Sequence, residues 1–206
     1  NVEFLLTDES KIDPLIQELG WSKADLARFL GVTRTTVSRW AHGQSRMDER
    51  QKAAVLFLQR ALEAETEKQA SRYGGGPRPR RFRKRFGKWA LSRGIRGLVR
   101  ERYQLEEPEG EPPPLGPDEI REIREQLGWI QAETAAFFGI THSTPAKWED
   151  ADPQVGPSTE AELIALRELA ARYRADEEFI RTLWQKGVRA FMTEVVGWVG
   201  ETYTEG

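Results

Sequence analysis

The sequence predicts an all-α protein made of two small helical bundles, on three observations. Apolar residues recur at helical spacing along most of the chain. Glycine, proline and hydroxyl residues interrupt that spacing where helices would start or end. Residues 19–40 also align without a gap to residues 127–148, with the same Leu-Gly-Trp start and the same glycine, threonine and tryptophan positions further on. A repeat this dense indicates two copies of one helical unit.

Composition excludes several classes of protein. The chain has 206 residues, which is enough for one large domain or two small ones. It has no cysteine, so we expect neither a disulfide framework nor a thiolate metal site. It shows no apolar run of bilayer-spanning length and no signal peptide, so the sequence predicts a cytoplasmic protein.

The small net charge of −2 hides a strong segregation of charge. Residues 1–72 carry 11 basic and 11 acidic side chains, and residues 73–102 carry 11 basic and one acidic. Residues 103–206 carry nine basic and 21 acidic side chains. This asymmetry predicts a segment that faces a polyanion within an otherwise acidic chain.

The first unit is predicted to begin with two short helices. The Asp-Pro pair at 13–14 suits the N-cap and first position of a helix that Gly20 ends. Ser22 and Asp25 have the spacing of a capping box, and the helix that they start stops at Gly31.

Two more helices complete the first unit. Thr33 can cap a helix over residues 34–41, which a His-Gly pair at 42–43 ends. Asp48 starts a longer helix, which the Gly-Gly-Gly-Pro break at 74–77 ends.

The helix that Gly31 ends and the helix over 34–41 predict a helix-turn-helix. We expect Val32, Val37 and Trp40 to pack inward and brace the second of these helices. An arginine on the opposite face can bond guanine through two N–H groups, and a threonine can bond a base or touch a thymine methyl group. The outer face is predicted to carry Arg34, Thr35, Thr36, Ser38 and Arg39.

The stretch WSKADLARFLGVTRTTVSRWAHG resembles the DNA-binding domain of the lambda repressor/Cro (XRE-type) helix-turn-helix family. The shared features are a Leu-Ala pair in the second helix, Gly-Val-Thr at the turn and a Val…Trp spacing in the third helix. The resemblance covers roughly residues 11–65. It implies a compact bundle of helices, dimeric operator binding and transcriptional control.

The resemblance also implies roles for individual residues. Lys23 matches a phosphate contact at the start of the second helix, where the family more often has glutamine. An ordinary helical bundle with incidental arginines is the alternative. The base- and phosphate-reading positions match Thr33, Arg34, Thr35, Thr36, Ser38 and Arg39.

The second copy departs from the first at its third helix. With Thr141 as N-cap, Pro145 stands where Val37 stands in the first copy, and its missing N–H costs one of the first intrahelical bonds. The acidic surroundings oppose phosphate approach. The copy is therefore either a second DNA reader or a degenerate copy kept for packing or dimerisation. Its candidate DNA contacts are Gln131, His142, Ser143, Thr144 and Lys147.

The basic segment over 77–103 interleaves cations with aromatic residues. Phe82, Phe86 and Trp89 are spaced for one face of an amphipathic helix. The cations would then contact DNA phosphates or reach a minor groove, each neutralised phosphate adding about 0.9 to the salt slope. RNA, an acidic protein partner and the chain's own acidic half are the alternatives. The candidate contacts are Arg78, Arg80, Arg81, Arg83, Lys84, Arg85 and Lys88.

The rest of the chain is predicted to contain a linker and two helices. The acidic, proline-rich residues 105–117 favour an extended linker. Thr159 and Glu162 have capping-box spacing, and Asp176 opens a last helix with a heavy aromatic stripe. That stripe would form core, with part of it pairing subunits.

We therefore divide the chain into a helix-turn-helix domain over 1–73, a connecting region over 74–117 and a second helix-turn-helix-like domain over 118–206. No nucleophile motif, phosphate loop or metal-ligand cluster appears, so the sequence predicts no enzyme, cofactor or metal.

The predicted function is a sequence-specific DNA-binding transcriptional regulator, a repressor of phage or prokaryotic origin. It would bind double-stranded DNA as a homodimer in the nucleoid, with the helix at 33–41 in the major groove. One alternative is a protein-interaction module, such as an antitoxin or adaptor, whose acidic C-terminal half binds a protein partner. Another is a DNA-packaging or replication initiator subunit.

Overall fold

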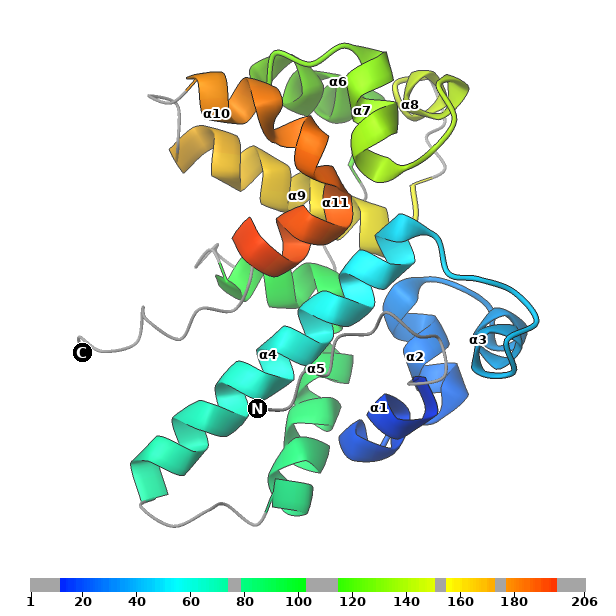
Figure 1. Cartoon of the computed structure of the whole chain (residues 1–206), viewed down its shortest axis with the longest axis vertical. Coiled ribbons are helices and arrows are strands. Elements are labelled where there is room, and N and C mark those ends of the chain that lie inside the picture. Colours follow the sequence, from blue (N-terminus) through cyan, green and yellow to red (C-terminus); the bar gives the residue numbers. More distant parts are fainter. Residues whose placement is uncertain (1–11, 74–78, 103–114, 151–154, 173–176, 196–206) are drawn as a thin grey trace.

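The computed structural model describes residues 12–73, 79–102, 115–150, 155–172 and 177–195 (Figure 1). Within these ranges every regular element is helical, which confirms the all-α prediction. None of the helices in these ranges is long and apolar enough to cross a membrane. Most of the predicted linker lies outside the described residues.

The first unit consists of α1 (Ile12–Leu19), α2 (Lys23–Leu30), α3 (Arg34–Ala41) and α4 (Glu49–Tyr73). The predicted capping box at the start of α2 is confirmed. The Ser22 amide donates to Asp25 Oδ2 at 2.8 Å, and the Asp25 amide donates back to Ser22 Oγ at 3.2 Å. The amide and hydroxyl of Ser22 lower the pKa of the Asp25 carboxyl.

The basic segment forms α5 (Pro79–Arg102), which bends at Gly94. The helix is amphipathic as predicted, because Phe86 is buried while Phe82 and Trp89 pack half-buried against the core. Before the bend, α5 lies against α1 and α2. Trp21 Nε1 donates to the Gly87 carbonyl at 2.8 Å, and a Cβ at Gly87 would lie 2.1 Å from a backbone oxygen of α1. Only glycine allows this approach.

The second unit begins with α6 (Pro117–Gln126), α7 (Gln131–Phe138), α8 (Ser143–Trp148) and α9 (Pro157–Arg172). It ends with α10 (Glu177–Thr182), the 3₁₀ turn η2 (Leu183–Lys186), α11 (Gly187–Ala190) and the π-helical turn η3 (Phe191–Val195). The bounds of α7 are those of α2 moved by 108 positions.

Local geometry in the second unit follows that of the first. The rings of Trp21 and Phe29 lie 5.2 Å apart at 51°, and those of Trp129 and Phe137 lie 5.1 Å apart at 49°. Trp129 Nε1 also donates to a backbone carbonyl, that of Ile180, at 3.2 Å. The surroundings of Trp129 before α7 therefore resemble those of Trp21 before α2, and the presence of a second complete helix-turn-helix copy remains a prediction.

The third helices differ as Pro145 predicts. In α3 the Val37 amide donates to the Thr33 carbonyl at 3.2 Å. Pro145 has no amide to make the corresponding bond, and the Thr144 amide bonds the Thr141 carbonyl at 2.9 Å instead. The helix α8 consequently has six residues where α3 has eight.

The predicted capping box at Thr159 and Glu162 is wrong. The helix α9 starts at Pro157, a residue type suited to a first helical position, so both residues lie inside the helix. Both are buried, and the Thr159 hydroxyl accepts a hydrogen bond from Arg50 Nη1 at 3.4 Å.

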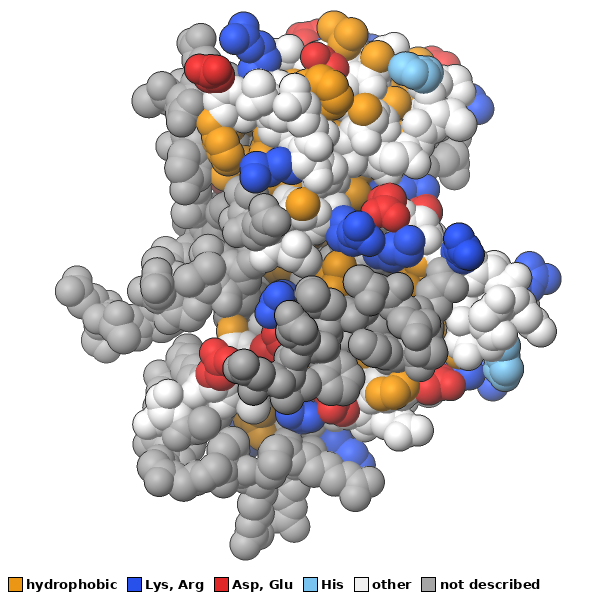
Figure 2. Space-filling model, in the orientation of Figure 1, with side chains coloured by type: hydrophobic (Ala, Val, Ile, Leu, Met, Phe, Trp, Pro, Cys, Tyr) orange, Lys and Arg blue, Asp and Glu red, His pale blue; other side chains and the backbone are white. Residues whose placement is uncertain are grey.

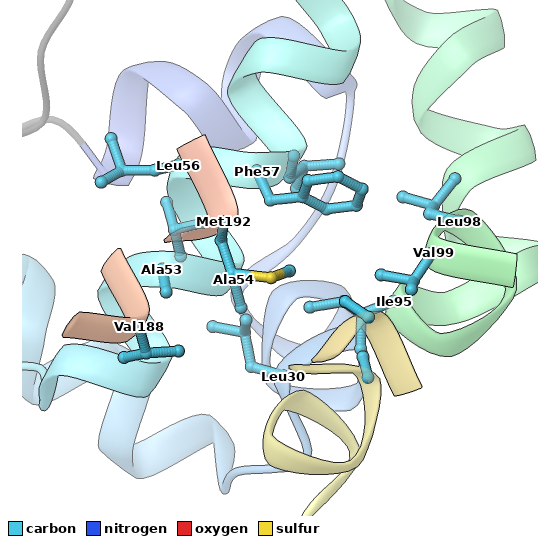
Figure 3. Close-up of a cluster of buried hydrophobic side chains, with 14 of the residues drawn as sticks. Leu30, Ala53, Ala54, Leu56, Phe57, Ile95, Leu98, Val99, Val188 and Met192 are labelled. Carbon is cyan, nitrogen blue, oxygen red and sulfur yellow. The ribbon is translucent and has the colours of Figure 1, made fainter. Parts of the chain in front are cut away.

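Buried side chains from both units join in one apolar cluster. Figure 3 shows part of it, where Phe57 of α4 lies near Leu98 of α5 and Met192 of the C-terminal segment. The helices α5 and α9 pack together, as do α4 and α11. The boundaries proposed at 73/74 and 117/118 remain predictions about how the chain is organised.

Candidate nucleic-acid interface

The helix α3 has one buried face and one exposed face. Val37 is 0% exposed and Trp40 is 2% exposed, and Val32 packs half-buried against the same core. Among the described residues, no hydrogen bond or ion pair engages the guanidinium of Arg34 or Arg39. The predicted contact residues divide into exposed Thr33, Arg34, Thr35 and Arg39 and half-buried Thr36 and Ser38.

Two local features fix the direction of α3. Thr33 is the N-cap, and its Oγ1 accepts from the Thr36 amide at 3.1 Å. Gly31 adopts a left-handed conformation with φ 70°, which turns the chain sharply between α2 and α3. A Cβ at Gly31 would lie 2.2 Å from the Pro157 ring of α9, so the turn is also held from outside the unit.

Further cations lie near α3. Lys23 Nζ at the start of α2 pairs with Asp13 at 3.4 Å, and both side chains remain partly exposed. An ion pair of this exposure is weak and can open toward a phosphate. Arg46, exposed on the loop that leaves α3, was missed by sequence reasoning, although a cation directly after a predicted reading helix was an available signal.

The basic segment has exposed cations on α5, and one of them lies over the turn before α2. The stem of Lys84 passes over Gly20, the turn before α2, because a Cβ there would lie 3.0 Å from Lys84 Cγ. Arg85 and Lys88 are exposed, whereas Arg83 pairs with Glu18 at 2.7 Å. Arg78 lies outside the described residues, and Arg80 and Arg81 belong to α5 without a described side-chain position.

In the second unit Gln131 stands where the first unit has Lys23, and it makes a different contact. Gln131 Nε2 donates to the Glu149 carboxylate at 3.2 Å. Arg124 Nε and Nη2 donate to the same carboxylate at 2.6 and 3.0 Å, and Arg121 Nε lies 3.7 Å away. Gln131 is thus bonded inside the protein.

This network has a clear electrostatic signature. The Glu149 side chain is 5% exposed, and burial alone would raise the pKa of its carboxyl. The hydrogen bonds from Arg124 and Gln131 and the charges of Arg124 and Arg121 outweigh burial and lower that pKa below its ordinary value. The hydrogen bond that Arg124 donates to Glu149 in turn raises the pKa of Arg124.

The outer face of α8 is exposed but carries different chemistry from that of α3. His142, Ser143 and Lys147 are exposed, and Thr144 is half-buried with its hydroxyl 2.8 Å from that of Thr141. The described residues of α8 include no arginine. Among the described residues, no three His, Asp or Glu side chains are grouped to hold a metal ion.

The order of α2, the turn at Gly31 and α3, with one buried and one exposed face on α3, is that of a helix-turn-helix. Residues 15–48 match the model of a family described as helix-turn-helix. The matched range runs from α1 through the loop before α4 and contains all of α2 and α3. It supports the XRE-type family for the first unit. No curated protein and no solved structure matches the chain.

Proposed function

We propose that the protein is a sequence-specific DNA-binding transcriptional regulator whose α3 enters the major groove. The observation that carries this is the pair of exposed guanidinium groups of Arg34 and Arg39, which have no hydrogen bond or ion pair among the described residues. They lie opposite the buried Val37 and Trp40. Arginine is the side chain that most often identifies guanine, through two parallel bonds to its O6 and N7. A braced helix presents those groups at a defined depth and angle.

Cations around α3 supply the sequence-independent part of binding in this proposal. Lys23 at the start of α2 and Lys84 over the turn before it would contact phosphates beside the major groove. Arg85 and Lys88 extend the exposed basic face along α5. Each contact would release counterions and make the affinity steeply salt-dependent.

Transcription would be regulated because the protein occupies a DNA site. A compact protein held on a promoter by α3 competes with other proteins for the same DNA, so repression in the nucleoid is the mode that we propose. A reporter gene behind the selected site should be silenced by the parent chain and released by a double Arg34→Ala, Arg39→Ala variant. Equal reporter output from the two would argue against repression through α3.

The DNA-binding claim is tested by selection from random duplexes with the full chain. The selected duplex and a scrambled duplex of the same composition are then titrated in one buffer at one salt concentration. A specific reader should prefer the selected duplex by roughly 10³-fold or more. Equal affinity for the two duplexes would remove sequence-specific reading as the function.

A further inference from the structure

The correspondence between the two units continues beyond the helix-turn-helix. Residues 86–99 of α5 align with residues 179–192 at an offset of 93 positions. Gly94 and Gly187 stand at equal places in this alignment and have similar backbone angles, with φ 65° and ψ 173° in the first and φ 73° and ψ 158° in the second. The aligned pairs include Phe86/Phe179, Ile95/Val188, Arg96/Arg189, Leu98/Phe191 and Val99/Met192.

The two units hold each other through reciprocal contacts at their turns. The turn at Gly31 lies against Pro157, the first residue of α9, and Ser158 Oγ donates to the Leu30 carbonyl at 3.0 Å. The turn at Gly139 lies against Glu49, the first residue of α4, whose Cγ would be 3.3 Å from an added Cβ. Each helix-turn-helix therefore rests on the fourth helix of the other unit.

The segments that follow the two glycine bends make a second reciprocal pair of contacts. Arg96, after the bend in α5, pairs with Glu160 of α9 at 3.1 Å. Arg189, after the bend at Gly187, pairs with Glu49 of α4 at 3.5 Å. Figure 3 shows apolar side chains of both segments, Ile95 and Val188 among them, in the cluster beside α4.

Two subunits related by a two-fold axis make reciprocal contacts of this kind. Here the contacts are made between two parts of one chain. The helices α3 and α8 consequently lie at the two ends of one edge of the molecule, with the start of α4 between them (Figure 1). The space-filling view shows Lys and Arg side chains beside Asp and Glu side chains in the middle of the molecule (Figure 2). Arg46 is exposed on the loop between α3 and α4.

We propose that a single chain occupies a whole DNA site, with α3 in one half-site and α8 against the next. This inference rests on the proposed function of α3. Helix-turn-helix dimers place their two reading helices about one helical turn apart, roughly 34 Å. Here the internal second unit takes the place of a partner subunit, so the homodimer expected from the sequence is not needed.

The site read by one chain is not a palindrome. The positions of Arg34, Thr35, Ser38 and Arg39 in α3 are held in α8 by His142, Ser143, Ala146 and Lys147. A lysine is a point charge suited to phosphate and lacks the planar fork that identifies guanine. The geometry thus gives a strongly specified half-site at α3 and a weakly specified, phosphate-held half-site at α8.

Stoichiometry and footprint test this. Sedimentation of the full chain with the selected duplex should give one chain per duplex. The chain has no cysteine, so an Ala146→Cys variant can carry a single iron–EDTA cleavage reagent on α8. Cleavage should fall on one side of the α3 half-site, about one helical turn away. An Arg181→Cys variant, labelled on α10 at the opposite edge, should give no localised cleavage (Figure 1).

Charge supplies an independent readout. A Lys147→Ala variant should lower the slope of log affinity against log salt by roughly 1, whereas Arg181→Ala should leave it unchanged. Two chains per duplex, cleavage on both sides of the half-site, or an unchanged slope for Lys147→Ala would each overturn the inference. If the parent chain prefers no duplex at all, the proposed function of α3 fails instead.

Discussion

The helix pair α2 and α3 and the helix pair α7 and α8 are similar in local geometry and differ in the chemistry of their exposed side chains. Each pair has a tryptophan on the buried face of its second helix. Trp40 of α3 is 2% exposed and Trp148 of α8 is 3% exposed. In the part of the chain that the structure describes, Arg34 and Arg39 of α3 are exposed and make no hydrogen bond or ion pair. The second unit instead bonds Arg124 and Gln131 to the buried Glu149. The same local fold can therefore carry polar groups that are free to contact DNA, or polar groups that stabilise the protein by bonding one another.

The largest expected effect comes from breaking the Glu149 network. Glu149→Ala would leave the half-buried Arg124 with the exposed Glu125 as its remaining carboxylate partner and should cost about 3 kcal/mol of unfolding free energy, the low end for a buried pair. A second substitution should rescue the lost stability. It is suggested by the first unit, where Ile16 and Ala41 stand in place of Arg124 and Glu149. Arg124→Ile combined with Glu149→Ala should restore most of the loss, measured by chemical denaturation.

The same network predicts a pH dependence in the acid range. The folded-state pKa of Glu149 lies below the ordinary value of 4.5, so its stabilisation is present above that value and is lost as the pH falls through the folded pKa. The double variant should lack this part of the acid transition. Equal acid sensitivity of parent and double variant would show that the carboxylate is not held as described.

A smaller effect separates the two turn glycines. Gly31→Ala places a Cβ in a left-handed conformation, which costs about 1–2 kcal/mol, and against the rigid Pro157 ring, for which overpacking adds roughly 1–3 kcal/mol. Gly139→Ala meets only the flexible Glu49 side chain at 3.3 Å, so we expect the conformational cost alone. Denaturation midpoints of the two variants check the order, and an equal or reversed order would contradict the described contact with α9.

The arginines of α3 should each matter for DNA binding and little for folding. Arg34→Ala and Arg39→Ala should each cost roughly 1–3 kcal/mol against the selected duplex and relax its sequence preference. Arg181→Ala on α10 removes the same charge far from α3 and serves as the control (Figure 1). A gel-shift titration in which the α3 variants match the control would refute the role of these side chains.

The smallest expected effect on stability comes from Glu162, which stands where the first unit has Ala54. Its carboxyl is fully buried without a hydrogen-bond partner, and burial raises its pKa well above 4.5. Folding then favours the protonated form, so stability should fall as the pH rises from about 4.5 toward the folded pKa. Glu162→Gln should raise the melting temperature at pH 7 with little change at pH 4.

Glu160 provides the matched control for that experiment. It is also buried, but it pairs with Arg96 and accepts the Leu115 amide at 2.9 Å. Glu160→Gln should therefore destabilise the protein at pH 7, opposite in sign to Glu162→Gln. If both substitutions shift the melting temperature the same way, the difference between a paired and an unpaired buried carboxyl is not what sets their effects.

The helices and turns of the first unit could be predicted from the sequence because local rules decide them. Ser22, Asp25, Thr33 and Gly31 act within a few residues of themselves, and their capping and turn roles are confirmed. The buried faces of α3 and α5 followed from helical spacing for the same reason.

What could not be predicted depends on residues far apart in the chain. The capping-box spacing at Thr159 was overridden by Pro157, which starts α9 earlier and against the turn at Gly31. In the sequence Glu149 is one of several acidic residues around the third helix of the second copy, and only the fold brings Arg124 to it. The reciprocal contacts between the units likewise have no local signature.

The central claim is that chemistry on the outer face of α3, and not its backbone, makes the first unit the reader. The most direct test gives α3 the outer residues of α8 in the full chain, through Arg34→His, Thr35→Ser, Ser38→Ala and Arg39→Lys together. We expect this variant to have an unchanged melting temperature. We also expect it to bind the selected duplex no better than the scrambled control. A variant that still selects the parent's sequence would contradict the central claim.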